Sequence, residues 1–456
     1  MARGKKKETL TPEECLQAAL VPVSEQPYKV PDNWCWVPLQ TINQYQSSSI
    51  DPSKQPETLF ELYSVPSSTN DYPEIVMGCE IGSTKQAVKK DDILLCKINP
   101  RINRVWKVSQ HTENALLASS EWIIVRNSQM VSDYLMYCFS APYFREYMLS
   151  NVSGVGGSLM RAQPKYVKTY PIPAPPRSEQ QCIVDRIESL FAKLDEAKQK
   201  AQDALDSFET RKAAILHKAF TGELTAQWRK EHGVGMESWQ TKKYSEICNI
   251  VRGGSPRPAG SPEFYGGNIP FMKVADITRN AGPYVNSTEY TIKEAGLKKT
   301  RMVDENTLLL TNSGATLGVP AICTFKTTFN DGIAAFLGLN PDTLLFHYYF
   351  WTSKTADLRA INKGAAQPNL NTDIIGNVEI SLPRENEQHE IVRILDNLLV
   401  KEQQAKESAE EVLEQIDLIK KAILARAFRG ELGTNDPSEE SAVELLKTCY
   451  CGKLQL

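Results

Sequence analysis

The sequence lacks several features that would assign it quickly to a class. No apolar run approaches the roughly 18 to 20 residues of a membrane span, and the basic start Met1–Lys7 is not followed by the apolar core of a signal peptide. We therefore expect a cytoplasmic protein. The 10 cysteines include no Cys-x-x-Cys pair, and the 5 histidines lie apart from them, so neither a disulfide framework nor a metal site is predicted.

An excess of positive charge is also missing. The chain has 52 Lys and Arg against 55 Asp and Glu, a formal net charge of −3, and no segment is a basic block. If the ligand is nucleic acid, a local patch must bind it, or other subunits must neutralise most of the phosphates. The length of 456 residues, 41% of them hydrophobic, is enough for about three domains with buried cores.

Motifs of catalysis are scarce. Gly253–Pro256 lacks the Gly-Lys-Ser/Thr ending of a phosphate loop, and Pro256 removes a backbone donor that such a loop needs. The Gly154–Gly157 cluster is not framed by a strand and a later ribose-binding acid. No Asn-Pro-Pro-Tyr type tetrapeptide for amino-methylation occurs, and Asp91-Asp92 suits a turn better than a metal-dependent nuclease. These absences predict a chain that is not itself an enzyme.

An internal repeat organises the sequence. Residues 179–224 recur 208 positions later as residues 387–432, with 19 identities in 46 ungapped positions. Both copies open on Glu-Gln and finish on Ala-Phe-x-Gly-Glu-Leu. Trp34 and Trp239 give a looser echo before each unit. The chain is therefore predicted to alternate between globular block and helix, twice.

The repeated segments are predicted helices. Apolar residues recur on a four-three spacing, each run starts just after a proline, and each stops at Gly222 or Gly430. In the first copy Ser178–Gln181 gives a capping-box pattern. About 44 residues make rods of roughly 65 Å, which we expect to pair with each other as an antiparallel coiled coil. Glu402 occupies an apolar position of the second seam, where a polar residue can fix register.

The blocks between the rods have short β-branched runs broken by Gly, Pro and Asn, with helix-like stretches near 131–149 and 344–361. We predict an α+β fold: two domains with curved β-sheets, separated by two long antiparallel helices and related by a pseudo-twofold. The predicted parts are an N-terminal tail at 1–30, a first block at 31–177, a first rod at 178–224, a second block at 225–383, a second rod at 384–432 and a C-terminal tail at 433–456.

These duplicated motifs resemble the specificity subunits of type I restriction-modification enzymes over nearly all of residues 31–432. The likeness rests on the repeated start at 173–180 and 382–388 and on the repeated finish, and in the second block on 253–256, 266–273 and 330–336. The first block has no close match to the Gly-Gly-Ser-Pro stretch.

The resemblance implies a DNA-recognition subunit without catalysis of its own. Each block would be a target recognition domain that reads one half of a split, asymmetric double-stranded DNA target, and the rods would hold the blocks at a fixed separation. Two methyltransferase (modification) subunits would dock on the rods, and restriction/translocase subunits would join them. No cofactor is implied for this chain: S-adenosylmethionine, ATP and Mg²⁺ are expected on the partner subunits.

Candidate DNA-binding residues are polar side chains on loops that can enter a groove, because arginine and lysine recognise guanine, and asparagine and glutamine recognise adenine. In the first block they are Ser83, Lys85, Gln86, Asn99, Arg101, Asn103, Arg104, Arg161 and Lys165. In the second block they are Arg252, Ser255, Arg257, Lys273, Asn312, Ser313, Gln367 and Asn369. The stretches 101–104 and 157–161 stand out because polar residues there interrupt apolar surroundings.

Two other hypotheses stay open. The chain is alternatively a methyltransferase and recognition subunit fused in one polypeptide, although the cofactor and base-pocket motifs are missing. It is also compatible with a coiled-coil interaction protein that carries two binding heads and has no DNA sequence preference.

Overall fold

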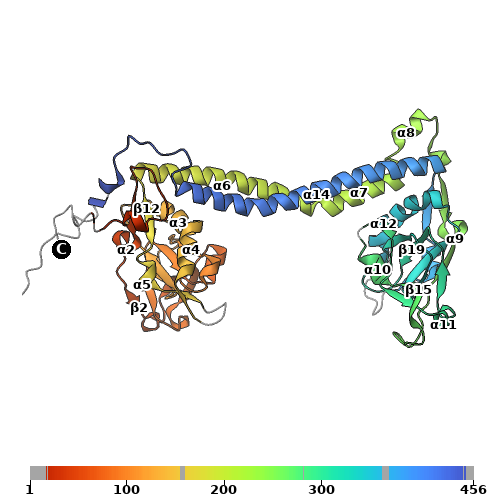
Figure 1. Ribbon diagram of the computed structural model, residues 1–456, viewed down its shortest axis with the longest axis horizontal. Coiled ribbons are helices and arrows are strands. Elements are labelled where there is room, and N and C mark those ends of the chain that lie inside the picture. Colours follow the sequence, from red (N-terminus) through yellow and green to blue (C-terminus); the bar gives the residue numbers. More distant parts are fainter. Residues whose placement is uncertain are drawn as a thin grey trace, which may run out of the picture. The chain divides into compact units, whose positions relative to one another are not determined.

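The computed structural model describes residues 17, 19–154, 160–280, 282–361, 369–444 and 446–447. The chain divides into two compact units, residues 1–201 with 411–456 and residues 202–410 (Figure 1). Each unit holds one globular block and part of each rod. Within the described residues, none of the helices combines the length and apolar character needed to cross a membrane.

The block of the first unit is built on small mixed sheets. A five-stranded sheet has the order β2-β5-β8-β3-β4, and a three-stranded sheet has the order β7-β6-β9. Two strand pairs, β1-β12 and β10-β11, complete the block. The strands are β1 (Cys35–Pro38), β2 (Ser49–Ile50), β3 (Leu59–Tyr63), β4 (Glu74–Met77), β5 (Lys85–Ala87), β6 (Ile93–Cys96), β7 (Val105–Lys107), β8 (Ala115–Ala118), β9 (Trp122–Val125), β10 (Val152–Ser153), β11 (Arg161–Ala162) and β12 (Pro171–Ala174).

The helical stretch expected near 131–149 is two helices in this unit. Pro142 has no backbone N–H and disfavours helical geometry at Ala141, so one helix ends and a second begins there. The helices of the first unit are α2 (Leu39–Ile42), α3 (Ser132–Ser140), α4 (Pro142–Ser150), α5 (Pro164–Val167) and α6 (Arg177–Asp206), with short 3-10 turns η1 (Val23–Glu25), η2 (Pro52–Lys54), η3 (Ser67–Asn70), η4 (Gly78–Glu80) and η5 (Pro100–Ile102).

The block of the second unit is also built on small mixed sheets, with a different number and order of strands. One sheet has the order β14-β22-β19-β20-β16, a second has β17-β15-β21-β18, and β13 pairs with β23. The strands are β13 (Gln240–Lys243), β14 (Asn249–Arg252), β15 (Tyr265–Met272), β16 (Tyr284–Val285), β17 (Tyr290–Ile292), β18 (Arg301–Val303), β19 (Thr307–Thr311), β20 (Pro320–Cys323), β21 (Thr327–Phe329), β22 (Ile333–Leu337) and β23 (Glu379–Leu382).

The helix expected near 344–361 is confirmed as a single element, α12. The α+β fold class is likewise confirmed, with mixed sheets and long helices. The helices of this unit are α7 (Phe208–Phe220), α8 (Ala226–Glu231), α9 (Tyr244–Ile247), α10 (Val274–Thr278), α11 (Glu294–Leu297), α12 (Leu344–Ile361) and α13 (Thr372–Gly376), with η6 (Met236–Ser238) and η7 (Pro341–Thr343); α14 (Glu385–Ala427) has residues in both units.

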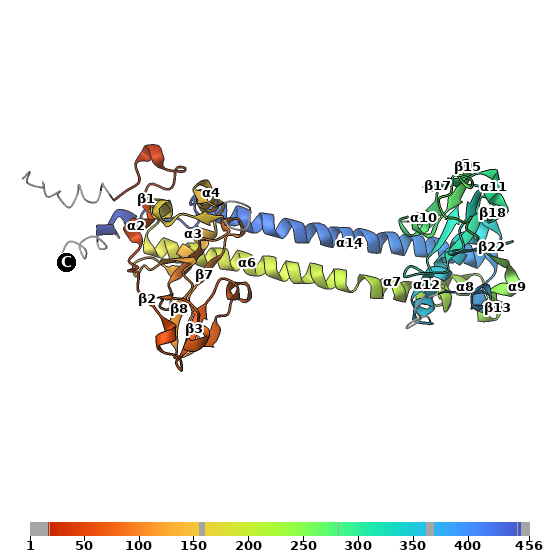
Figure 2. The ribbon, with the colours of Figure 1, turned by 90° about the horizontal axis from the view of Figure 1, so that it is seen from below.

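The rods run antiparallel within each unit, as predicted (Figure 2). In the first unit Lys420 of α14 pairs with Asp195 of α6 at 2.5 Å, and Thr434 donates a hydrogen bond to the earlier Glu179 at 2.7 Å. In the second unit α14 lies beside α7, and Lys406 lies 5.1 Å above the ring of Phe208. Later residues of α14 therefore meet earlier residues of the opposite rod.

The polar seam residue Glu402 has a partner. Its carboxylate accepts a hydrogen bond from Nε of Arg211 at 2.8 Å, and both side chains are about one third exposed or less. Arg211 also donates to the carbonyl of Ala204 and to the Ser207 hydroxyl. A polar contact of this kind selects one register of the seam, as the sequence indicated.

The first rod is irregular at Ser207, where the prediction was one uninterrupted helix, although the Ser207 N–H still donates to the carbonyl of Asp203 at 3.1 Å and its carbonyl accepts from the N–H of Arg211 at 2.9 Å. α6 ends at Asp206 and α7 begins at Phe208, with Ser207 between them. The Ser207 hydroxyl donates to the carbonyl of Asp203 at 2.7 Å, and such back-bonding favours a bend. The second rod, α14, is unbroken over 43 residues.

The repeated Glu-Gln pair at the start of each rod has a structural role. The amide of Gln180 donates to the carbonyl of Pro175 at 3.0 Å, and the amide of Gln388 donates to the carbonyl of Pro383 at 2.8 Å. Both glutamines are buried. Helix α6 already begins at Arg177, so Ser178 lies inside it and not at the predicted cap position.

The repeated finish of each rod packs against a block: the second rod finishes on the first block, and the first rod finishes on the second block. Phe428 is fully buried and packs edge-on against Tyr134 of α3, with ring centroids 5.3 Å apart. In the second unit Phe220 makes the same kind of contact with Phe346 and Phe350 of α12, both at 5.4 Å. Gly222 and Gly430 follow with φ values of +82° and +74°, which glycine adopts without strain.

The two segments expected to be weakly ordered tails contact the first block where the structure describes them. The backbone N–H of Val21 donates to the carbonyl of Trp36, and the Trp34 indole donates to the Asn435 side chain at 3.2 Å. Ala442 and Leu446 are fully buried in the core of the first unit. The prediction of weakly ordered tails is therefore wrong for these residues. The sequence did not reveal their packing because the residues that they contact are distant in sequence.

The equivalent glutamates Glu179 and Glu387 differ in their partners. Glu387 is buried and accepts hydrogen bonds from Arg229 at 2.6 Å, from Thr225 at 2.7 Å and from the Trp239 indole at 3.0 Å. Glu179 is equally buried, but among the described residues only Thr434 donates to it. Burial therefore raises the pKa of Glu179 above its usual value.

We predict that Glu387→Gln destabilises the second unit strongly. The substitution leaves the buried Arg229 guanidinium without its charged partner, which costs about 3–5 kcal/mol in comparable sites. Chemical denaturation of the full chain measures the loss, and an unfolding free energy within 1 kcal/mol of wild type, roughly the value of an exposed pair, contradicts the prediction.

Glu179→Gln is the matched control. Because the folded-state pKa of Glu179 is raised, its ionisation destabilises the folded state as pH rises from the unfolded pKa through the folded one. Glu179→Gln removes that cost while it retains the Thr434 contact. The variant should match the wild type at low pH and exceed its stability at neutral pH.

Candidate nucleic-acid interface

The candidate residues of the second unit gather around one turn. Residues 330–332 connect β21 to β22, and the N–H of Asn330 donates to the carbonyl of Met272, next to Lys273. The carbonyl of Gly332 accepts from the N–H of Asn312 at 2.9 Å. This turn joins loops that lie far apart in the sequence, and we call it the 330–332 turn.

Glycines allow the Gly-Gly-Ser-Pro loop to lie against this turn. The N–H groups of Gly253 and Gly254 donate to the carbonyls of Ile333 and Phe329, at 3.0 and 3.1 Å. A Cβ on Gly253 would lie 2.3 Å from the carbonyl oxygen of Asn330, well inside contact distance. The loop is therefore packed against backbone and is no phosphate-binding nest.

Three predicted residues converge on Asp331: Arg252 at the end of β14, and Ser255 and Arg257 in the loop that follows it. Arg252 donates from Nε to the main-chain carbonyl of Asp331 at 2.6 Å, and the Ser255 hydroxyl donates to its carboxylate at 2.6 Å. Nη2 of Arg257 lies 3.9 Å from the other carboxylate oxygen. The Arg257 side chain is 73% exposed, so it is available to a ligand.

The other candidates of the second unit have different accessibility. Ser313 and Asn369 form an isolated β-bridge beside the turn, with Asn369 exposed. Nζ of Lys273 lies 3.1 Å above the ring of Tyr290. Asn312 is only 1% exposed, so its prediction as a base-reading residue does not fit the structure as it stands. Gln367 lies outside the described residues.

In the first unit the candidates gather around residues 119–122. The amide of Gln86 donates to the carbonyls of Ser119 and Trp122, at 3.3 and 3.0 Å. The guanidinium of Arg161 pairs with the Glu121 carboxylate at 3.2 Å. Because its amide protons are used by the main chain, Gln86 holds the loop and is not free to recognise a base.

A neighbouring turn presents Arg101. Turn η5 is flanked by Asn99 and Asn103, whose φ values of +49° and +51° are left-handed, a region that asparagine tolerates better than most residues. The N–H of Asn99 donates to the carbonyl of Met160, and the Asn103 amide donates to the carbonyl of Ser140. The Arg101 side chain is exposed at the tip.

The remaining candidates of the first unit lie at its surface or along its edges. Lys85 is half-buried and donates to the hydroxyl of the exposed Ser83 at 2.6 Å, and burial lowers the pKa of its ammonium group. Lys165 is exposed, with Nζ 4.7 Å above the ring of Tyr166. Arg104 lies beside Cys96, whose thiol pKa is raised by burial.

Sequence reasoning missed Asp331, Glu121 and Tyr290. Each contacts a predicted cation: Asp331 meets Arg257, Glu121 meets Arg161 and Tyr290 lies under Lys273. A search for basic and amide side chains does not select carboxylates. The Asn-Asp-Gly sequence of 330–332 is nevertheless a turn signal, and it could have pointed to Asp331.

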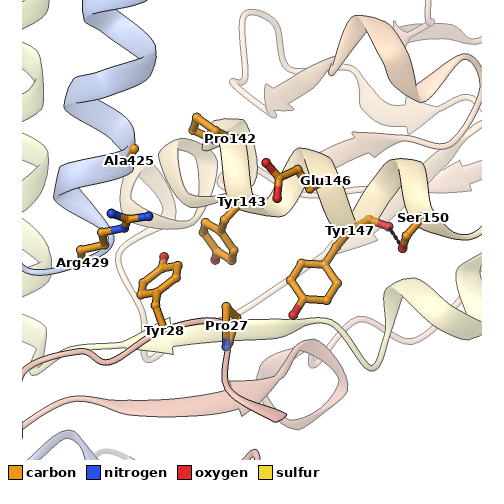
Figure 3. Close-up of a pocket in the computed structure, with 9 residues that line it drawn as sticks. All are labelled: Pro27, Tyr28, Pro142, Tyr143, Glu146, Tyr147, Ser150, Ala425 and Arg429. Carbon is orange, nitrogen blue, oxygen red and sulfur yellow. Dashed lines mark hydrogen bonds between the residues drawn. The ribbon is translucent and has the colours of Figure 1, made fainter.

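A pocket of about 470 Å³ in the first unit contains none of these residues. It lies between α4 and the end of the second rod, where Tyr28, Tyr143 and Tyr147 surround an open space (Figure 3). The guanidinium of Arg429 lies 5.1 Å above the Tyr28 ring. Within the part of the chain that the structure describes, no three His, Cys, Asp or Glu side chains lie close enough to hold a metal ion.

Comparisons with known proteins identify related sequences and a related fold. The family model described as "Type I restriction modification DNA specificity domain" matches residues 236–415. The resemblance to the specificity subunits of type I restriction-modification enzymes is confirmed. The match covers the second block together with part of the second rod.

The sequence is also similar to individual specificity subunits. The EcoDI specificity subunit of Escherichia coli is 28% identical over 207 residues, which are 44% of this chain and 45% of that protein. The MjaIX specificity subunit of Methanocaldococcus jannaschii is 30% identical over 198 residues, 41% of this chain and 44% of that protein. These matches span less than half of each relative.

The fold extends over most of a solved specificity subunit. The crystal structure of the HsdS subunit from Thermoanaerobacter tengcongensis matches with a TM-score of 0.66 and 22% identity, covering 90% of this chain and 100% of that chain. At this identity the match supports the fold, with its two blocks and long helices.

We predict that Gly253→Ala disturbs the interface of the second unit. The new Cβ meets two main-chain oxygens, of Asn330 and Phe329, so the loop must move at a cost of about 1–3 kcal/mol. Gly282→Ala is the control, because a Cβ there meets no atom within 4 Å and should change stability by no more than about 0.5 kcal/mol. Thermal unfolding measures the stability of both variants. If Gly253→Ala and Gly282→Ala change the melting temperature equally, the close-packing argument is wrong.

Proposed function

We propose that the chain is the DNA sequence-specificity subunit of a type I restriction-modification complex, and that each block reads one half of an asymmetric bipartite target. The observation that carries the proposal is the gathering of predicted base-reading side chains in each unit: Arg257 and Ser313 beside the 330–332 turn, and Arg101 and Arg161 on adjacent segments joined by the backbone hydrogen bond from Asn99 to Met160. Arginine forks on rigid turns suit base edges in a groove.

The paired rods support the second part of the proposal, a fixed separation of the two half-sites. Two related blocks on one antiparallel pair of rods match a site whose halves face the protein about one helical turn, roughly 10 bp, apart. The register contact between Arg211 and Glu402 would keep that separation constant. Because the blocks differ in sheet order, the two halves should differ in sequence.

Partner subunits complete the proposed complex. Leu418 and Ile419 on α14 are 63% and 42% exposed, large apolar side chains for which a docked protein would provide a partner. We assign this surface to a modification subunit, with a second copy on the related face and restriction/translocase subunits joining the core. S-adenosylmethionine, ATP and Mg²⁺ belong to these partners in the proposal.

The second candidate is a coiled-coil interaction protein with two binding heads and no DNA sequence preference. The exposed apolar residues on α14 fit this alternative as well. A fused methyltransferase is a third, and it predicts that the isolated chain binds S-adenosylmethionine in calorimetry. The three hypotheses are separated by whether sequence-specific DNA binding is found and by which subunit carries the cofactor.

We expect the full chain with its modification subunits to enrich two short motifs at one fixed spacing from a pool of random duplexes. Bandshift selection followed by sequencing measures this. Insertion of seven residues, two helical turns, into both rods should change the spacing and leave the two motifs unchanged. A single contiguous motif, or none, rejects the bipartite proposal.

We predict that Leu418→Glu blocks assembly with the modification subunit while the chain stays folded. The residue is exposed, so the fold should tolerate the charge, whereas an apolar contact with a partner should not. Co-purification should fall at least tenfold. Glu414→Ala, one turn earlier and also exposed, is the control and should retain the partner. Equal assembly of the two variants assigns docking to another surface.

A further inference from the structure

Arg257 and Asp331 form an open pair in the second unit. Their charged atoms are 3.9 Å apart, beyond hydrogen-bond distance, and their side chains are 73% and 46% exposed. Arg279 and Glu289 have similar exposure, 70% and 49%, but their 2.7 Å contact is a closed hydrogen bond. The first pair thus presents an unused donor fork beside an acceptor oxygen.

The backbones under this open pair are fixed. The Ser255 hydroxyl binds Oδ1 of Asp331 at 2.6 Å, which leaves Oδ2 facing Arg257. Arg252 holds the main-chain carbonyl of Asp331, and the Tyr265 hydroxyl donates to the carbonyl of Pro256 at 3.0 Å. The backbone positions of Arg257 and Asp331 are therefore fixed, while their charged side-chain ends are not hydrogen-bonded to each other.

A carboxylate at a DNA-binding surface has a restricted set of partners. Phosphates repel it, and in the major groove the hydrogen-bond donors of the bases are the exocyclic amino groups of cytosine and adenine. Oδ2 of Asp331 is therefore suited to one of these amino groups.

The neighbouring arginine decides between cytosine and adenine. Within a G·C pair the cytosine N4 amino group is hydrogen-bonded to guanine O6, so the two atoms lie about 3 Å apart. Guanine adds a second acceptor, N7, that completes the site for an arginine fork. Thymine, paired with adenine, offers one acceptor and a methyl group. A guanidinium 3.9 Å from a carboxylate thus matches the edge of G·C.

We propose that Arg257 and Asp331 together read a single G·C base pair in the major groove, with Arg257 donating to guanine O6 and N7 and Asp331 accepting from cytosine N4. The inference rests on the proposed function and specifies one position within it. Asp331 is then a specificity-determining residue and not merely the partner of a surface arginine.

The test is duplex selection with the full chain and its modification subunits. Arg257→Ala and Asp331→Ala should relax the preference at one and the same G·C pair, each by at least about fivefold, and leave the other positions unchanged. Arg257→Lys, which keeps the charge but loses the fork, should relax it partly. Arg279→Ala is the control and should alter no position.

Each other outcome identifies what fails. If the wild type selects no motif, the proposed function fails before this inference is tested. If the wild type selects a bipartite motif and the two variants relax different positions, or relax an A·T pair, the shared reading of G·C is wrong. If both variants weaken binding to all sequences alike while melting temperatures are unchanged, the pair contacts phosphates or holds the loop, and the inference is also wrong.

Discussion

The structure depends on the contacts that join both ends of each rod to the blocks. At the start of a rod, a buried glutamine donates to the carbonyl of the proline five residues earlier, and at its end a phenylalanine packs against a helix of the block. Gln180, Gln388 and Phe428 are buried and Phe220 is partly buried, so the end of each rod is coupled to the core of the block that it contacts. The repeated residues thus stabilise the junctions between rods and blocks, and under the proposed function the diverged residues between them would serve recognition.

The rods were predictable because their determinants are local. Proline before each start, glycine after each end and a four-three apolar spacing specify a helix without reference to the rest of the chain. The irregularity at Ser207 was missed because it involves side-chain bonding to a preceding carbonyl, which the apolar spacing does not reveal. The terminal segments were missed for a similar reason: Leu446 is buried by residues hundreds of positions away.

The candidate site shows the same division between local and tertiary information. Glycine and proline correctly indicated the loops of Arg101 and Arg257, but the loop prediction is wrong for Lys85, Gln86, Arg161 and Arg252, which lie on strands β5, β11 and β14. Accessibility could not be predicted this way. Asn312 is covered by the packed block, and the amide of Gln86 is used by the main chain of a neighbouring loop. Asp331 was overlooked because the search selected basic and amide side chains. An aspartate becomes a candidate only when the structure shows the arginines that it contacts.

Under the proposed function, the acidic partners also affect how a chain without a net positive charge would select DNA. A net charge of −3 gives little general attraction to phosphates, and both Arg161 and Arg257 have a carboxylate beside them. In that proposal each carboxylate would weaken binding to any duplex, and the loss would be smaller where a base amino group replaces the arginine as the partner of the carboxylate. The partner subunits would then supply the affinity for DNA. The arginine–carboxylate pairs would supply the discrimination between sequences. Under that division, removing Glu121 should increase binding to unrelated DNA more than to the selected target.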